Sequence, residues 1–265
     1  MAERYAVIGH PVAHSKSPRI HAEFARACGQ DITYERIEAP LDGFAAAADA
    51  FRAAGGRGLN VTLPFKEEAS RYAIRLSDRA RRAGAVNTLA FGADIFGDTT
   101  DGVGLVRDLE ENLGFVLAGR RVLLMGAGGA ALGVVQAILE CDAASLVVAN
   151  RTQAKARAIA ERFGCTSSGY EALAGRRFDL VVNATSAGLA GQAPPLPDGL
   201  LSPDVLAYDM VYGRETPFLT AARAAGARAH DGLGMLVEQA AESFFLWRGM
   251  RPATGPVLAG LRGGD

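Results

Sequence analysis

Short runs of β-forming residues alternate with alanine-rich helical stretches along most of the 265-residue chain. This alternation is typical of α/β architecture, in which crossover helices join parallel strands. The pattern falls into two blocks with a boundary near Asp101. We therefore expect two domains: a small α/β domain in residues 1–101, completed by C-terminal helices in about 236–265, and a doubly wound parallel sheet in residues 102–235.

The first block is predicted to contain a βαβαβ unit closed by a hairpin. The expected strands are 5–8, 32–37 and 58–61, the expected helices are 17–28 and 44–54, and the hairpin arms are 88–91 and 95–97. Gly92-Ala93-Asp94 separates the two arms and is a turn signal.

The second block is entered through a predicted helix over 101–113. The expected strands are 121–125, 145–149, 180–183 and 206–209, and the expected helices are 130–140 and 153–162. The proline-rich stretch 191–197 is expected to be a surface loop. A last helix over 233–247 is apolar on much of its surface, and we expect it to pack against the first block.

A glycine-rich turn follows the strand-like run 121–125 and opens a helix. It reads Gly126-Ala127-Gly128-Gly129-Ala130-Ala131 and matches the G-x-G-x-x-A pattern of Rossmann-type dinucleotide sites. Gly126 permits a tight turn, Gly128 lets the backbone approach a pyrophosphate, and the helix N-terminus offers free N–H groups to that anion. The alternative is an ordinary glycine-rich turn without a ligand.

Basic residues follow the second strand of the second block, where an acidic residue often binds the ribose of the nucleotide. Asn150, Arg151 and Thr152 follow the second strand of the second block, with Lys155 just beyond them. An NAD-binding chain usually has an acidic residue here, which binds the ribose hydroxyl. Arg151 can instead hold a 2′-phosphate by a bidentate fork, and Lys155 adds positive charge. The sequence thus favours NADP over NAD, against the alternative of solvated charges at a helix start.

Polar residues cluster at the predicted strand ends of the first block, in 14–18, 60–66, 87–88 and 99–102. Their hydroxyls, amides, amine and carboxylate suit a small ligand rich in hydroxyls. Taken singly, each cluster fits a turn or a cap; Ser17-Pro18 fits a helix N-cap with proline at the first helical position.

Lysine is rare in this chain. Among 28 basic residues, only Lys16, Lys66 and Lys155 are lysines. Arginine keeps its proton, whereas lysine can release one, so a lysine retained in an arginine-rich chain is a candidate for proton chemistry. Chance placement is the alternative.

Together these segments resemble the shikimate dehydrogenases. That family shares, in this order, a G-x-P-x-x-H-S-x-S-P start, an N-V-T-x-P-F-K segment, a G-A-V-N-T turn and a T-D-G triplet. The resemblance continues through the glycine turn to the stretches 150–152, 183–186, 208–212 and 231–239, and so spans nearly the whole chain. Ala22 and Thr99 depart from common family residues, but neither replaces a proposed catalytic group.

The resemblance implies reversible, NADP-dependent reduction of 3-dehydroshikimate to shikimate, with the first block as the substrate-binding catalytic domain. Lys66 and Asp101 would be the catalytic pair, Lys66 donating a proton on reduction and accepting one on oxidation. Which of the two is the formal base stays open, and a purely structural ion pair is the alternative. Asp101 would also orient a ring hydroxyl.

The same resemblance implies the binding residues. Ser15 and Ser17 would hold the substrate carboxylate, and the other substrate contacts would be Asn60, Thr62, Asn87, Tyr212 and Gln239. Ala130, Thr185, Met210 and Gly232 would line the nicotinamide side of the cofactor site.

Composition excludes several other classes. A net charge of -1 provides no general field for nucleic acids or anionic membranes. The three cysteines are far apart and we expect them to be reduced; the histidines lack ligand spacing, so no metal is implied, and His14 is expected to pack. The N-terminus enters a strand-like run directly, so we expect a cytoplasmic protein, monomeric or homodimeric.

Two rival functions remain. A quinate/shikimate dehydrogenase would use the same catalytic groups on a substrate with an additional ring hydroxyl, often with NAD. A non-catalytic regulator would bind pathway metabolites or NADP as a signal; the presence of both Lys66 and Asp101 disfavours it.

Overall fold

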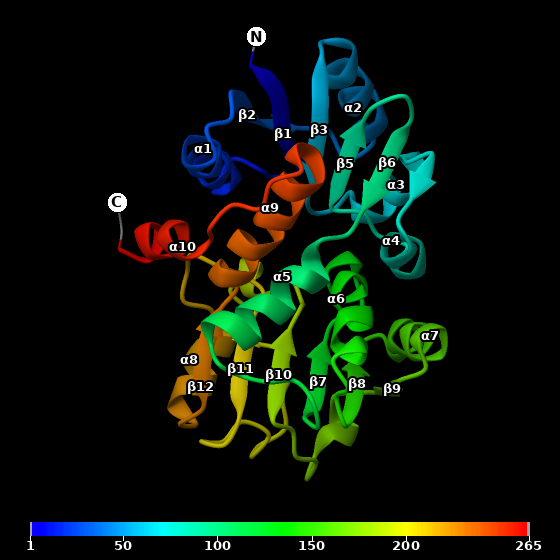
Figure 1. Cartoon of the computed structure of the whole chain (residues 1–265). Coiled ribbons are helices and arrows are strands. Elements are labelled where there is room, and N and C mark those ends of the chain that lie inside the picture. Colours follow the sequence, from blue (N-terminus) through cyan, green and yellow to red (C-terminus); the bar gives the residue numbers. More distant parts are fainter. Residues whose placement is uncertain (1, 264–265) are drawn as a thin grey trace. The chain divides into compact units, whose positions relative to one another are not determined.

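The computed structural model describes residues 2–263, which form two compact units. Unit 1 extends through Leu105 and resumes at Leu236, and unit 2 is Val106–Met235. Each unit contains one six-stranded sheet with helices packed on it (Figure 1). The expected α/β fold class is confirmed.

The sheet of unit 1 has the strand order β2-β1-β3-β5-β6-β4. Strands β1, β2 and β3 are parallel, β5 is antiparallel to β3, and β5 and β6 form an antiparallel hairpin, as the predicted βαβαβ unit and hairpin require. The strands are β1 (Glu3–Gly9), β2 (Ile32–Glu38), β3 (Gly56–Val61), β4 (Arg75–Leu76), β5 (Thr88–Phe91) and β6 (Ile95–Asp98). The helices are α1 (Ser17–Ala27), α2 (Phe44–Ala53), α3 (Lys66–Tyr72), α4 (Asp78–Ala83), α5 (Asp101–Arg107), α9 (Leu233–Arg248), which starts in unit 2, and α10 (Gly255–Arg262).

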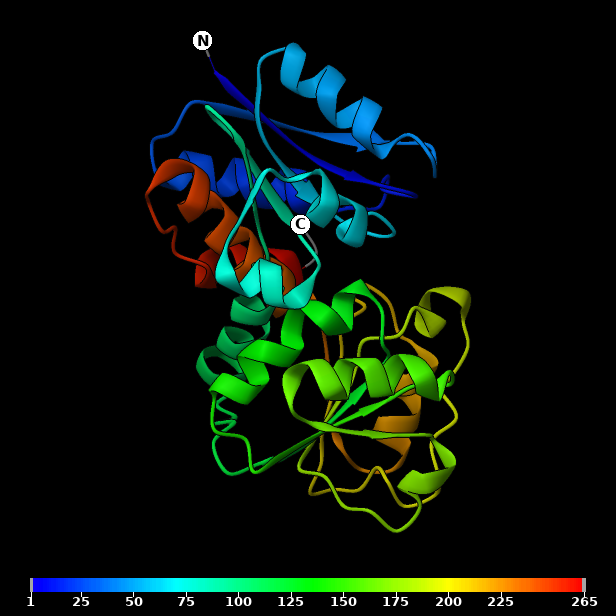
Figure 2. The same ribbon diagram turned by 90° about the vertical axis from the view of Figure 1, so that its right-hand side faces the viewer.

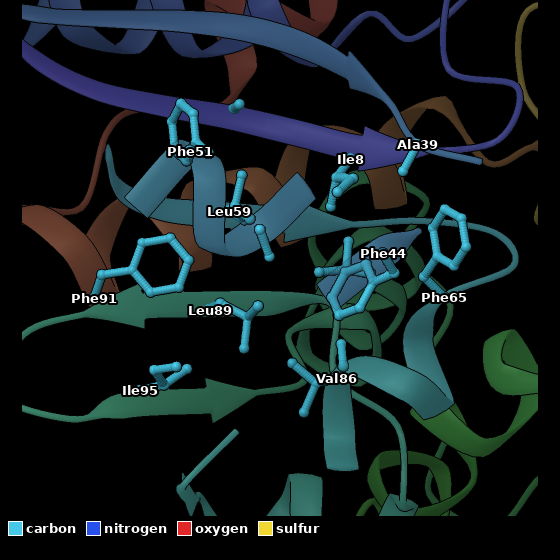
Figure 3. Close-up of a cluster of buried hydrophobic side chains, with 14 of the residues drawn as sticks. Ile8, Ala39, Phe44, Phe51, Leu59, Phe65, Val86, Leu89, Phe91 and Ile95 are labelled. Atoms are coloured by element: carbon cyan, nitrogen blue, oxygen red, sulfur yellow. The ribbon is translucent and has the colours of Figure 1, made fainter. Parts of the chain in front are cut away.

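Alternation along β3 separates an apolar face from a polar one. Leu59 and Val61 belong to a buried apolar cluster with residues of α2, part of which Figure 3 shows. Gly58 and Asn60 face the other way, toward α9: a Cβ on Gly58 would lie 2.5 Å from Trp247 Nε1, which donates to the Leu89 carbonyl. Figure 2 shows α2 on one side of the sheet and α1 with α9 on the other. The returning C-terminal segment therefore covers the face that carries Asn60.

The sheet of unit 2 is entirely parallel, in the order β12-β11-β10-β7-β8-β9. Read from β9, this is the 3-2-1-4-5-6 order of doubly wound nucleotide-binding sheets. The elements are β7 (Arg121–Met125), α6 (Gly129–Glu140), β8 (Ser145–Ala149), α7 (Gln153–Phe163), β9 (Thr166–Ser168), β10 (Leu180–Asn183), β11 (Leu206–Asp209), α8 (Pro217–Ala224) and β12 (Arg228–Asp231).

The helix predicted over 101–113 changes its winding partway. It is α-helical to Arg107 and continues as a π-helix over Asp108–Asn112. Asp108 is buried there; its carboxylate accepts from the Tyr208 hydroxyl at 2.6 Å and from the Asn112 amide at 3.0 Å. A Cβ on Gly234 would lie 1.8 Å from Asp108 Oδ1, so this glycine makes room for the buried carboxylate.

Candidate functional site

The predicted catalytic pair lies within unit 1. Lys66 is the first residue of α3 and Asp101 the first residue of α5. Lys66 Nζ donates to Asp101 Oδ2 at 2.5 Å, and only 13% and 6% of the two side chains are exposed. Phe65 anchors the turn before Lys66 by stacking on Phe44, with ring centroids 5.4 Å apart (Figure 3).

Asn87 holds the other oxygen of Asp101. Asn87 Oδ1 accepts from the Thr100 backbone N–H at 2.8 Å, and because that N–H can only donate, the orientation of the amide is determined. Asn87 Nδ2 therefore faces Asp101 Oδ1, to which it donates at 2.9 Å. Both carboxylate oxygens of Asp101 accept hydrogen bonds, which is the pattern of an ionised carboxylate.

Asn60 and Gln239 join the same cluster from β3 and α9. Asn60 Nδ2 donates to the Asn87 carbonyl at 3.3 Å, and Gln239 Oε1 accepts from Asn87 Nδ2 at 3.1 Å. Thr62, half-buried, directly follows β3, and a Cβ on Gly9 would lie 2.4 Å from its methyl group. Apart from Tyr212, which lies in unit 2, the substrate residues predicted from sequence all belong to unit 1.

The two serines lie on the loop that opens α1. Ser15 and Ser17 are buried; Ser15 Oγ accepts from Ser17 N and donates to Ser17 Oγ at 3.1 Å, which leaves the Ser17 proton for a ligand. The alternative of Ser17 as the N-cap is wrong: Lys16 is the N-cap residue, and no side chain makes a capping hydrogen bond. The Ser17 hydroxyl therefore does not cap the helix, although Ser17 is its first residue.

Arg36 on β2 supports this loop and was missed by the sequence argument. Its Nε and Nη2 donate to the Ser15 carbonyl at 3.0 and 2.6 Å. A charged fork on one carbonyl holds the loop firmly. Arg36 and Ser15 are 21 positions apart, so no local sequence pattern would have predicted the contact.

One of the histidines differs from expectation. His14 is exposed, so the expected packing is wrong. His21 is fully buried and stacks on Tyr34 with ring centroids 4.2 Å apart, and the Tyr34 hydroxyl donates to Asn60 Oδ1 at 2.7 Å. Burial lowers the pKa of His21 to about 3, with a smaller opposing effect from Asn60. His21 is thus a neutral packing partner beneath the polar cluster.

The glycine turn of unit 2 fits a dinucleotide pyrophosphate. Gly126 has a φ of 108°, and a Cβ there would lie 2.9 Å from the Ala184 carbonyl, so the turn needs glycine. Gly128 is the N-cap of α6 and has open space on its Cβ side. Ala127, Gly129 and Ala130 complete the turn and the first residues of α6, whose N-terminal N–H groups can donate to an anion.

The residues predicted to read the ribose phosphate follow β8. Asn150 Nδ2 donates to the Thr152 carbonyl at 3.0 Å, and Arg151 and Lys155 are exposed. Arg151 lines an open pocket of about 370 Å³ with Gln153 and Tyr170. The cationic side chains needed to hold a 2′-phosphate lie on the loop after β8, which carries Arg151, and in the first turn of α7, which carries Lys155.

The nicotinamide-side residues follow neighbouring strands of unit 2. Asn183, Asp209 and Asp231 are paired at the ends of β10, β11 and β12. Thr185 donates to Asn183 Oδ1 through its N–H and its hydroxyl, and a Cβ on Gly232 would lie 2.5 Å from the Met210 carbonyl. Ligands of open α/β sheets bind at such carboxyl ends.

Buried Asp209 fixes the segment after β11. Its Oδ2 accepts from the Thr216 hydroxyl at 2.6 Å and its Oδ1 from the Val211 N–H at 3.0 Å. Burial raises the pKa of this carboxyl, against the effect of these hydrogen bonds. Met210 and Tyr212 thereby extend from an anchored strand end.

Two further features bear on the site. Across residues 2–263, no group of three or more His, Cys, Asp or Glu side chains has a geometry that could bind a metal. Within that same range, no helix combines the length and apolar character of a membrane span.

A six-stranded doubly wound sheet with a glycine turn and a basic loop, together with a separate unit that carries a Lys-Asp pair, defines the class of Rossmann-type dehydrogenases with a distinct catalytic unit. Three family models match: "Shikimate dehydrogenase substrate binding domain" over residues 7–89, "Shikimate / quinate 5-dehydrogenase" over 108–190, and "Shikimate 5'-dehydrogenase C-terminal domain" over 232–261.

Curated relatives match over the full length. "Shikimate dehydrogenase (NADP(+))" of Dechloromonas aromatica is 59% identical over 99% of this chain and 98% of its own, and that of Nitrosospira multiformis is 60% identical with the same coverage. The shikimate 5-dehydrogenase of Thermus thermophilus, solved with NADP(H) and shikimate, is 38% identical with a TM-score of 0.89, covering 98% of this chain and 99% of its own. The chain belongs to the shikimate dehydrogenase family.

Proposed function

We propose that this protein catalyses the reversible, NADP-dependent reduction of 3-dehydroshikimate to shikimate, a step toward chorismate and the aromatic amino acids. The observation that carries the proposal is the ion pair of Lys66 and Asp101, buried in a cluster of amides and hydroxyls. The printed names of the relatives above support the substrate and the cofactor.

NADPH, when bound, supplies the hydride that reduces the ketone carbon. The Lys66 ammonium donates a proton to the carbonyl oxygen, which becomes the hydroxyl of the product; on oxidation Lys66 takes that proton back. Asp101 holds the ammonium in place through its Oδ2, and Asn87 donates to its Oδ1. Asp101 also accepts from a substrate hydroxyl in this proposal.

Substrate recognition divides between the ends of the ligand. Ser15 and Ser17 hold the carboxylate, supported by the free Ser17 proton and by Arg36 behind the loop. Asn60, Thr62, Asn87, Gln239 and Tyr212 hold the ring hydroxyls. The Asn60 and Asn87 N–H groups also donate to protein acceptors, so the hydrogen-bonded network holds these two amides in place.

Cofactor binding is assigned to unit 2. The residues are Gly126, Ala127, Gly128, Gly129 and Ala130 for the pyrophosphate, Asn150, Arg151, Thr152 and Lys155 for the ribose phosphate, and Thr185, Met210 and Gly232, together with Ala130, for the nicotinamide side. Arg151 and Lys155, without an acid on the loop, support NADP over NAD.

A quinate/shikimate dehydrogenase is the second candidate, since one matching family model carries both substrates in its description. Assay of purified protein with shikimate or quinate, each combined with NADP or NAD, distinguishes the two. Activity confined to shikimate with NADP supports the first proposal, and a preference for quinate supports the second.

We further propose a cytoplasmic location and a monomer or homodimer. The free thiols of Cys28, Cys141 and Cys165 support a reducing compartment. Light scattering on the eluting protein distinguishes monomer from dimer.

A further inference from the structure

We propose that Ser243 and Thr88 are positioning residues that hold the amides of Asn60 and Asn87 in the orientation that the catalytic pair requires. Neither belongs to the substrate or cofactor contacts assigned above. The inference rests on the proposed function, because its effect is exerted through Lys66 and Asp101.

The two hydroxyls link both asparagines. Ser243 lies on α9, four residues after Gln239, and Thr88 opens β5; both are fully buried. Ser243 Oγ accepts from Asn60 Nδ2 at 2.9 Å and lies 2.8 Å from Thr88 Oγ1. Thr88 Oγ1 donates to Asn87 Oδ1 at 2.9 Å. When Ser243 donates to Thr88, a continuous chain of three hydrogen bonds leads from Asn60 Nδ2 through the two hydroxyls to Asn87 Oδ1.

This chain of hydrogen bonds ends at the catalytic carboxylate. Asn87 Oδ1 accepts hydrogen bonds from the Thr88 hydroxyl and from the Thr100 N–H. Asn87 Nδ2 therefore faces Asp101 Oδ1. Asp101 in turn accepts from Lys66 through its other oxygen. A displaced Asn87 amide would therefore move the carboxylate that holds the proton donor, and small displacements of reacting groups cost up to about 100-fold in rate.

Ser243 also ties the arrangement to α9. Its hydroxyl lies 3.0 Å from the Gln239 carbonyl, to which it can donate in place of Thr88. Gln239 Oε1 accepts from Asn87 Nδ2, so one turn of α9 contacts the same amide network through two side chains. Besides the Thr100 N–H, the hydrogen bonds that hold the two asparagine amides thus come from hydroxyls that are themselves fully buried.

The test compares Thr88→Val and Ser243→Ala with Thr88→Ser and with Thr33→Val. Thr88→Val keeps the shape and removes the hydroxyl, and Thr88→Ser restores it. Thr33→Val is the control for loss of a threonine hydroxyl, at an exposed position of β2. The measurements are kcat and KM for shikimate, KM for NADP, and the melting temperature of each variant.

We expect kcat to fall about 10- to 100-fold in Thr88→Val and Ser243→Ala, with KM for NADP unchanged. Thr88→Ser should remain within about threefold of wild type, and Thr33→Val should match wild type. If Thr88→Val does not fold, the kcat of Ser243→Ala alone tests the inference, because this substitution removes only the hydroxyl oxygen. Wild-type kcat in a folded Ser243→Ala or Thr88→Val overturns the inference, as does a kcat loss in Thr88→Ser as large as that in Thr88→Val.

The assay separates this inference from the proposed function. Wild-type protein that does not oxidise shikimate with NADP refutes the function itself. Active wild-type protein, inactive Lys66→Met and normal hydroxyl variants refute only the positioning roles of Ser243 and Thr88.

Discussion

Lys66 and Asp101, 35 positions apart in sequence, meet at 2.5 Å between Nζ and Oδ2. Each is the first residue of its helix, and each is largely buried. Because Asn87 occupies the other oxygen of Asp101, the ammonium has one well-defined position. Such a pair can have either of two roles: it can be an ion pair that stabilises the fold, or it can hold a proton donor for catalysis.

Lys66→Arg distinguishes these roles. Arginine keeps the charge beside Asp101 but does not release a proton, so a structural pair survives while proton transfer fails. We expect kcat to fall about 100- to 10,000-fold in both Lys66→Arg and Lys66→Met. The affinity for NADPH, measured by fluorescence titration, should stay close to that of wild type. Near-normal turnover in Lys66→Arg would show that the pair is structural.

Arg151→Ala should weaken NADP binding selectively. Loss of a charge-assisted contact with the 2′-phosphate is expected to raise KM for NADP about 10- to 100-fold, with little change for NAD. Arg157→Ala is the matched control, since it removes an exposed arginine from α7. Equal increases of KM for NADP and NAD in Arg151→Ala would contradict the phosphate contact.

Arg36 should affect the substrate rather than the chemical step. Arg36→Met removes both hydrogen bonds to the Ser15 carbonyl and should raise KM for shikimate about tenfold, with kcat nearly unchanged. Arg36→Lys, which keeps the charge but not the fork, should be intermediate. Arg52→Met on α2 serves as the control for loss of an exposed arginine. An unchanged KM for shikimate in Arg36→Met would show that Arg36 does not contribute to substrate binding.

Buried His21 predicts an acid-sensitive stability of unit 1. Its pKa is about 3 in the folded protein, against 6.5 for the free side chain, so below pH 6.5 the unfolded chain takes up a proton that the folded chain refuses. The contribution is fully present above pH 6.5 and is lost as the pH falls toward 3. Between pH 7 and 5 the loss amounts to about 2 kcal/mol.

In His21→Phe, the free energy of unfolding should fall less between pH 7 and 5 than it does in wild type. Urea unfolding at pH 7 and 5 measures this free energy, with the fluorescence of Trp247 as the probe. Trp247 is the single tryptophan, lies in unit 1, and has its ring centroid 5.4 Å from that of His21. The same decline in wild type and variant would show that His21 is not the responsible group.

Buried parallel strands were predictable from sequence because their apolar runs are continuous. Strands β7, β8, β10 and β11 have the predicted bounds. Strand β12 was missed, since Arg228-Ala229-His230-Asp231 contains no β-branched residue and no Phe, Tyr or Trp, and is strand only through pairing with β11. The short helices α3 and α4 were also not predicted, whereas α10 lies in the segment where C-terminal helices were expected. Helix α8 was missed although Thr216 and Pro217 form a recognisable helix start.

The site divides in a similar way. Motif residues such as Lys66, Asp101 and Arg151 could be named from the resemblance, but the residues that orient them could not. Ser243 contacts Asn60 across 183 positions, and neither belongs to a local pattern that includes the other. Such contacts arise only once α9 packs on the sheet, which sequence periodicity does not specify.

The proposed activity can be measured by following nicotinamide absorbance with the purified protein, with shikimate or quinate crossed against NADP or NAD. We expect rapid reduction of NADP with shikimate and far slower reaction in the other three pairings. Absence of turnover in every pairing, with NADP still bound, would contradict the proposed activity and identify the protein as a non-catalytic binder.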